Sequence, residues 1–273
     1  MKLLFVAPLF IALISCSSFK NPREIKQGHL DGLKYESLKR YDAKRLGEPL
    51  KSKDPLALCH RGEFENAEKI FKEKLDKNLN NYIYWNQIST CYILKKEYNK
   101  AKNYLDLALN AAKKDEQKAV VLNNFGVVQM ETKNFIEAKE YFKKSIELSK
   151  KYMTPKYNLS QIYLKHGLYG KAEDQLTELM HKNDKDIDFL NSMGHLKLMQ
   201  KDYNKSLRFF EQIPQEYQSR DDVATNMAMT YYMLGKLEMA KKTLDNSDKD
   251  NGYYTSAQLE MSKKIEKQLN GGR

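Results

Sequence analysis

Apolar and small residues recur at fixed positions along most of the chain. Each copy of the pattern has an aromatic residue or Leu, a small residue three positions later, and Phe or Leu four positions after that. The small residues are separated by 34, 37, 34, 34 and 34 residues, and they are Ala67, Ala101, Ala138, Ala172, Ser206 and Ala240. Charged residues lie between the apolar ones, as in amphipathic helices. The pattern therefore predicts helices throughout this region.

A second small residue stands twelve positions before the first in five of the six copies. These residues are Ser89, Gly126, Ser160, Gly194 and Ala228. We expect two helices to cross closely at each such pair, so every copy predicts one helical hairpin. The first copy has Pro55 at this position, which predicts a truncated or irregular leading helix.

Three glycines and one irregular spacing refine the hairpin prediction. Gly62, Gly167 and Gly235 fall at the turn between the paired helices, where a positive φ is easily adopted by glycine. The single spacing of 37 residues indicates a three-residue insertion, which falls near Lys113 to Lys118.

A period of 34 residues resembles the tetratricopeptide repeat. The resemblance covers residues 54–250 and implies an all-α superhelix, an α-solenoid of six helical hairpins. Tyr253 to Leu269 has the pattern of one more amphipathic helix, so residues 251–273 are expected to form a capping helix and tail. Twelve hairpin helices and this cap predict thirteen helices.

The first sixteen residues have the pattern of a secretory signal. Lys2 precedes the apolar run Leu3 to Ile14, which is shorter than the ~20 residues that span a bilayer. Leu13-Ile14-Ser15-Cys16 resembles the bacterial lipobox, which implies that residues 1–15 are removed and that Cys16 is lipidated. An ordinary signal peptide with an incidental Cys16 is the alternative. Ser17 after the cysteine implies, in that family, the outer membrane, with the protein facing the periplasm.

Residues 16–53 show no apolar period and contain scattered Gly and Pro, so we expect a tether. The formal charge is +11, but only seven of the 47 basic residues are Arg. Because bases and phosphates are bound best by Arg, and no Arg cluster occurs, nucleic acid is not an expected partner.

The sequence contains no recognisable catalytic or cofactor-binding motif. The five His residues are scattered, and there is no phosphate-binding Gly loop or nucleophile elbow. We therefore predict no catalytic residue, no metal ligand and no cofactor. Cys59 and Cys91 could pair in an oxidising compartment, but cysteines on neighbouring helices are more often small core residues, which is the favoured expectation.

The repeat register predicts which residues face the concave side. If the small residue of the trailing helix, such as Ala101 or Ala138, is position 20, positions 5, 9, 12 and 13 of the leading helix point away from its partner helix. These are positions that the resembled family uses for ligands, and they predict a groove for a segment of a partner protein. Its residues are Asn86, Ile93, Asn123, Val127, Met130, Tyr157, Gln161, Leu164, Asn191, His195, Leu198, Thr225, Met229, Tyr232 and Met233.

Two alternatives stay open for this groove. Apolar residues at position 12 could instead pack against the next repeat. The carboxamides at positions 5 and 6 could hold a peptide backbone, because they both donate and accept hydrogen bonds, but Asn at position 6 is also common in the family for structural reasons. The Lys and Asn clamp by which one branch of the family binds a terminal carboxylate is missing. Met229 and Met233 are expected to form the most adaptable part of the groove.

A lipobox followed by six repeats and a cap resembles the type IV pilus biogenesis lipoproteins, the pilotins that assist a secretin ring. The stretches 122–126 and 141–146 carry that resemblance. It implies a non-enzymatic scaffold for an envelope machine, anchored by its lipid. Two alternatives are an adaptor for peptidoglycan hydrolases or proteases, which would be expected to form a homodimer, and a subunit of the outer-membrane protein insertion apparatus.

Overall fold

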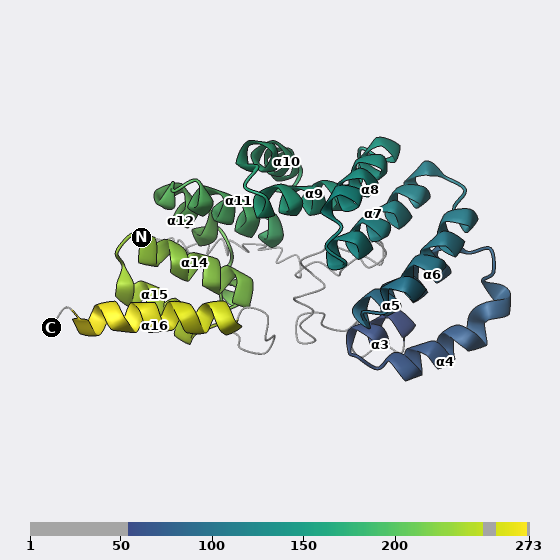
Figure 1. Cartoon of the computed structure of the whole chain (residues 1–273), viewed down its shortest axis with the longest axis horizontal. Helices are drawn as coiled ribbons and strands as arrows, with labels where there is room; N and C mark the ends of the chain where they lie inside the picture. Colours follow the sequence, from purple (N-terminus) through teal and green to yellow (C-terminus); the bar gives the residue numbers. More distant parts are fainter. Residues whose placement is uncertain (1–53, 248–254, 272–273) are drawn as a thin grey trace, which may run out of the picture.

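The computed structural model describes residues 54–247 and 255–271, and all regular structure in these ranges is helical (Figure 1). The predicted signal peptide, Cys16 and the tether lie outside the described residues, as do the end of the predicted repeat region and the start of the predicted cap. None of the described helices is long and apolar enough to cross a membrane.

Six helical hairpins follow one another along an arc (Figure 1). They are α3 (Pro55–His60) with α4 (Phe64–Lys74), α5 (Tyr82–Leu94) with α6 (Tyr98–Ala111), α7 (Asp115–Glu131) with α8 (Phe135–Leu148), α9 (Thr154–Lys165) with α10 (Tyr169–Lys182), α11 (Ile187–Met199) with α12 (Tyr203–Glu211), and α14 (Asp221–Met233) with α15 (Leu237–Asp245). The leading helix of each pair from α5 onward lies on the inside of the arc, and the trailing helix on the outside. The all-α hairpin array predicted from the sequence is confirmed.

The described residues contain fourteen α-helices, one more than predicted. The additional helix is α13 (Gln215–Gln218), a single turn in the connection between α12 and α14, and a 3₁₀ turn, η3 (Leu75–Lys77), follows α4. The cap is α16 (Thr255–Gly271), and its Met261 and Ile265 are buried against the sixth hairpin. This confirms the predicted terminal helix, whose apolar side covers the end of the array.

The small residues lie where the helices of a hairpin cross. A Cβ atom added to Gly126 would lie 2.4 Å from Cε1 of Phe142, and one added to Gly194 would lie 2.6 Å from Cζ of Phe210. Both phenylalanines are fully buried. The glycines are therefore required for close approach of the two helices in repeats three and five.

Left-handed residues end the leading helices. Gly62, Gly167 and Gly235 have φ of 80°, 69° and 73°, as the sequence predicts. In the other three hairpins the same place is taken by lysines with φ of 63°, 65° and 62°, at Lys96, Lys133 and Lys201. The sequence pattern did not identify these turns, because lysine carries no signal for a positive φ.

The predicted insertion lengthens one helix. α7 has 17 residues where α5 has 13, and it begins four residues before the position at which the repeat starts. The side-chain oxygen of Gln117 accepts hydrogen bonds from the backbone N–H of Lys113 and Lys114, at 2.7 and 3.0 Å. The extra residues are thus absorbed as a helical turn with a capped start.

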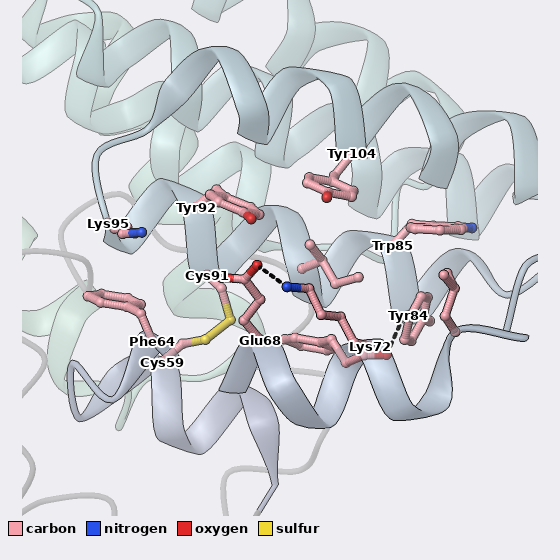
Figure 2. A pocket seen from close by; sticks show the side chains of 13 residues that line it. Cys59, Phe64, Glu68, Lys72, Tyr84, Trp85, Cys91, Tyr92, Lys95 and Tyr104 are labelled. Atoms are coloured by element: carbon pink, nitrogen blue, oxygen red, sulfur yellow. Dashed lines mark hydrogen bonds and ion pairs between the residues drawn. A yellow bond between two sulfur atoms is a disulfide. The ribbon is translucent and has the colours of Figure 1, made fainter. Parts of the chain in front are cut away.

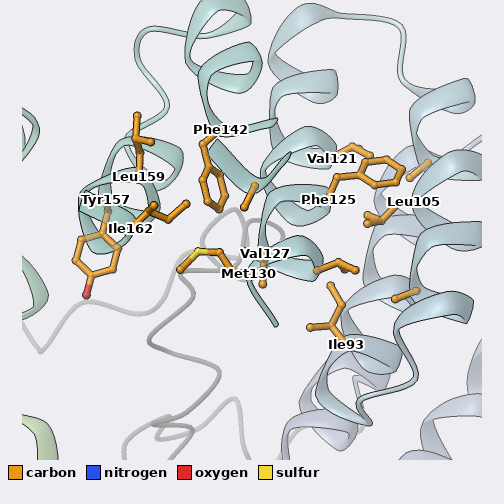
Figure 3. Close-up of a cluster of buried hydrophobic side chains, with 14 of the residues drawn as sticks. Ile93, Leu105, Val121, Phe125, Val127, Met130, Phe142, Tyr157, Leu159 and Ile162 are labelled. Atoms are coloured by element: carbon orange, nitrogen blue, oxygen red, sulfur yellow. The ribbon is translucent and has the colours of Figure 1, made fainter. Parts of the chain in front are cut away.

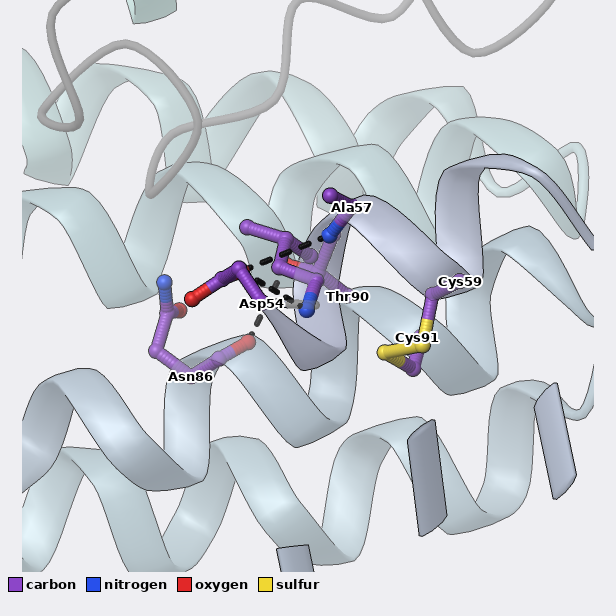
Figure 4. The surroundings of a disulfide bond; sticks show 7 residues. Asp54, Ala57, Cys59, Asn86, Thr90 and Cys91 are labelled. Carbon is purple, nitrogen blue, oxygen red and sulfur yellow. Dashed lines mark hydrogen bonds between the residues drawn. A yellow bond between two sulfur atoms is a disulfide. The ribbon is translucent and has the colours of Figure 1, made fainter. Parts of the chain in front are cut away.

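The first hairpin is short and covalently fixed. α3 has six residues, and the Asp54 side chain accepts hydrogen bonds from the N–H of Leu56 and Ala57 at its start (Figure 4). At its other end Cys59 forms a disulfide with Cys91 of α5. Their Cα atoms are 5.2 Å apart, a separation that suits a disulfide. The expectation of unbonded core cysteines was wrong: both are buried, and they are also bonded to each other.

Candidate functional site

Carboxamides connect the leading helices along the inner face of the arc. Nδ2 of Asn124 donates to Oδ1 of Asn86 at 2.9 Å, and Nδ2 of Asn158 donates to Oδ1 of Asn123 at 2.9 Å. Nδ2 of Asn226 donates to Oδ1 of Asn191 at 3.1 Å. In each pair position 6 of one repeat reaches back to position 5 of the preceding repeat. These amides therefore hold adjacent repeats together, as the structural alternative for position 6 expects.

The row of amides is interrupted at repeat four, where Tyr157 occupies position 5. Ser192 at position 6 of the next repeat therefore meets no carboxamide at position 5 of the preceding repeat. It accepts a hydrogen bond from Nε2 of Gln161, at position 9, over 3.0 Å. The connection between repeats is thus preserved by a different pair of side chains.

A charged cluster lies beside this row, between α11 and α14. Nε and Nη2 of Arg220 donate to the two carboxylate oxygens of Asp222 at 2.9 and 2.6 Å, and Nη2 also reaches Asp188 at 2.9 Å. Asn191 donates to Asp222 at 2.8 Å. Asp222 is almost completely buried. The repeat pattern could not identify this cluster, because Arg220 lies in the loop that precedes α14.

Most of the apolar residues predicted for the groove are buried. The hydrophobic cluster of the first five hairpins contains Ile93, Val127, Met130 and Tyr157, which Figure 3 labels, and also Leu164. Leu198 is also buried. Burial of the position 12 residues is what the packing alternative expects. A binding role for these side chains stays a prediction, and it would require a partner to reach residues with little exposed surface.

Two inner-face methionines of the sixth repeat are exposed, as is Met199 at position 13 of the fifth. Met229 is 36% exposed and Met233 43%, and they lie one turn apart on α14. Met227, on the same helix, is buried in the last hydrophobic cluster. Tyr232 is half-buried against the last hydrophobic cluster, and Thr225 donates its hydroxyl to the carbonyl of Asp221. Flexible thioethers on an accessible surface suit variable apolar contacts.

His195 lies at position 9 of α11. Burial lowers the pKa of its imidazole, so the ring is neutral at neutral pH. A neutral ring offers one donor and one acceptor. Its role in binding a partner stays a prediction.

A pocket that the sequence did not predict lies between α4 and the α5–α6 hairpin (Figure 2). Its volume is about 230 Å³, and its walls combine the Cys59–Cys91 disulfide with six aromatic side chains: Phe64, Phe71, Tyr84, Trp85, Tyr92 and Tyr104. Tyr92 and Tyr104 stack at 5.2 Å, and Trp85 stacks on Tyr104 at 6.0 Å. Concentration of aromatic residues in the second repeat was the only sequence signal for it.

Charged groups line the mouth of this pocket. Glu68 and Lys72 pair at 3.0 Å along α4. Burial, with the nearby Tyr104 and Glu68, raises the pKa of Tyr92 to about 12, so its hydroxyl stays protonated. Binding pockets for drug-sized molecules usually measure about 300–1,000 Å³. This one is smaller, and its size and lining suit an apolar side chain better than a cofactor.

Known proteins share this fold. The family model of the tetratricopeptide repeat matches residues 82–115 and 119–152, which are the second and third hairpins. A search of curated protein sequences finds no match. Among solved structures, the chain is similar to PilW, a widely conserved type IV pilus biogenesis factor, with 20% identity and a TM-score of 0.57 over 74% of this chain and 94% of PilW.

Two further structures extend this comparison. A tetratricopeptide repeat protein from Parabacteroides merdae is similar at 17% identity, with a TM-score of 0.57 over 86% of this chain and all of that protein (100%). The Cut9–Hcn1 hetero-tetramer of the APC/C is similar at 16% identity and a TM-score of 0.60 over 77% of this chain. The match spans 41% of the length of that chain. At these identities the similarity concerns the fold.

The six hairpins, their close crossings and their inter-repeat amides define an α-solenoid. More specifically, two of the hairpins match the tetratricopeptide-repeat model, and the whole array has the helical fold of that repeat. Stacked repeats of this kind present an extended concave surface, the surface that interaction scaffolds use to bind partner proteins.

Proposed function

We propose that the protein is a membrane-anchored scaffold of a Gram-negative envelope, without enzymatic activity. It is held by a lipid on Cys16, faces the periplasm from the outer membrane and binds a segment of a partner protein along its inner face. It assists assembly or localisation of an envelope machine, and a type IV pilus secretin is the first partner to test. The lipobox-like sequence Leu13 to Cys16 supports the anchor. Several acyl chains there would hold the protein stably on a membrane.

The observation that carries the binding site is the exposure of Met229 and Met233 on one face of α14. The hairpin does not need these side chains for its own packing, since Met227 and Ala228 fill the core from the same helix. An apolar surface that folding does not require indicates contact with a partner.

Replacement of Met229 and Met233 together by Glu tests the site. Because each methionine is already more than one-third exposed, helicity and the unfolding midpoint should stay unchanged, whereas two buried charges in a complex should reduce partner binding at least tenfold. The measurement is co-purification of the secretin from crosslinked native membranes, together with circular dichroism. Met239→Glu is the matched control, because Met239 is 46% exposed on the outer helix α15. Equal binding by the double variant and the control would exclude this site.

Replacement of Cys16 by Ala tests the anchor separately. Without the thiol no lipid can be attached, so the variant should leave the membrane fraction, whereas Ser18→Ala should remain in it. Flotation of membranes in a density gradient makes the measurement, and mass spectrometry shows whether acyl chains are present. A Cys16→Ala chain that still floats with membranes would refute the anchor without affecting the proposed binding surface.

A further inference from the structure

We infer that a pocket between the α8–α9 loop and α10 binds a phosphate group. Its volume is about 170 Å³, several times the ~30 Å³ of one water molecule. The charged residues that line it are four lysines and one acid: Lys150, Lys151, Lys156, Lys182 and Glu178. The lining therefore carries an excess of three positive charges.

Lys156 is the residue that requires an explanation. Its side chain is 9% exposed, and its ammonium pairs with Glu178 of α10. It stands in the first turn of α9, where the helix dipole disfavours a cation. Burial adds to that cost. A lysine placed there for stability alone would be an unfavourable choice, whereas a lysine that faces a bound anion is expected there.

The other lysines have a simpler alternative explanation, which Lys156 does not share. Lys150, Lys151 and Lys182 lie near the C-terminal ends of α8 and α10, where cations are favoured by the helix dipole. Within the described ranges none of these three forms an ion pair, so Glu178 is the single acid that offsets four lysines in the pocket lining. The uncompensated charge is what an anion would neutralise.

Phosphate fits this lining best among common anions. It carries close to two negative charges at neutral pH and three strong acceptor oxygens. Lysine binds phosphate as a point charge with three rotatable donors, so several lysines can neutralise a phosphate group without the bidentate geometry that Arg provides. Met153 and Lys156 line the pocket, so it lies beside the start of α9, where the helix dipole favours an anion. The phosphate could come from solution or from a phospholipid headgroup, and the same lysines would serve both.

The test uses the full chain in neutral detergent, with ¹³C-labelled methionine methyl groups. Met153 lines the pocket and reports on it, whereas Met227, buried in the last hydrophobic cluster, is the internal reference. Titration with inorganic phosphate at constant ionic strength should shift the Met153 signal saturably and leave Met227 unchanged. Lys150→Gln with Lys151→Gln should weaken phosphate binding about tenfold.

Two more variants separate binding from folding. Lys156→Gln should also weaken phosphate binding. This change leaves Glu178 without its ion-pair partner, but the Glu178 carboxylate is half-exposed and stays solvated, so the fold should remain intact. Lys171→Gln is the matched control: it removes the same charge from an exposed residue at the opposite end of α10, and phosphate binding should not change. A Met153 signal that does not saturate, or that responds equally in all these variants, would overturn the inference.

Lipid vesicles identify the source of the phosphate. The full chain is reconstituted into vesicles of phosphatidylcholine alone or of an equimolar mixture with phosphatidic acid, and the rate of reductive methylation is measured for each lysine. Protection of Lys150, Lys151 and Lys182 in the mixture, but not of Lys171, would support a headgroup ligand. Binding of inorganic phosphate without this protection would support a soluble phosphate. If the protein shows neither phosphate binding nor lysine protection, the proposed site is refuted.

Discussion

Alanine in place of Gly126 should destabilise the protein by about 1–3 kcal/mol. In an unobstructed helix the same change is stabilising, because alanine is favoured over glycine by about 1 kcal/mol. Here the added Cβ would lie 2.4 Å from the ring of Phe142, which is fully buried and cannot move aside without disturbing its neighbours. The sign of the effect therefore distinguishes a packing glycine from a merely tolerated one. Denaturant unfolding followed by circular dichroism measures it.

Two variants control this prediction. Gly170→Ala, in the first turn of α10, has open space around the added Cβ and should be neutral or stabilising by up to about 1 kcal/mol. Phe142→Leu combined with Gly126→Ala should recover part of the loss, giving a coupling energy of about 0.5–3 kcal/mol between the two sites. If Gly126→Ala proves as stable as Gly170→Ala, the close helix crossing in repeat three is incorrect.

Loss of the disulfide should lower the free energy of unfolding by more than Gly126→Ala does. Cys59→Ser with Cys91→Ser releases a link between residues 32 apart in sequence, which should lower the free energy of unfolding by roughly 2–4 kcal/mol. The change should be local, because an isolated helix of six residues is not stable in water and α3 depends on its contact with α5. Amide hydrogen exchange should show α3 losing protection while α14 and α15 keep theirs.

Reduction of the unmodified chain gives the matched comparison. A reductant should bring the wild-type protein to the stability of the double serine variant and should have no effect on that variant. Unchanged protection of α3 in both would show that its six residues are held by packing alone.

The repeat register could be predicted because it depends on positions where the hairpin accepts only small residues. Gly126, Gly194 and Ala138 are small where helices cross, and each is fixed by the ring or helix that it contacts. The predicted truncation of the first leading helix followed from Pro55, and the cap followed from an unpaired amphipathic pattern. These features are local in sequence, and so they were readable without the structure.

The inner face was harder to predict because its residues make contacts between repeats. Asn124 and Asn158 look like free carboxamides in the sequence, but in the structure each reaches the preceding repeat. The aromatic pocket depends on how far α4 stands from α5, and the lysine pocket on how α10 ends beside the start of α9. Neither separation is encoded in a pattern within one helix. The positive φ angles of three turn residues could not be predicted for a different reason. The turn imposes this conformation on Lys96, Lys133 and Lys201, and their residue type does not indicate it.

The disulfide also determines how the array responds to mechanical tension. A pull on the chain that precedes Asp54 enters the array through α3, which is too short to resist being peeled away. The Cys59–Cys91 bond passes that load directly to α5, a helix of 13 residues whose core side chains are packed between two neighbouring hairpins. Force applied at the N-terminal side therefore reaches the second hairpin through the disulfide.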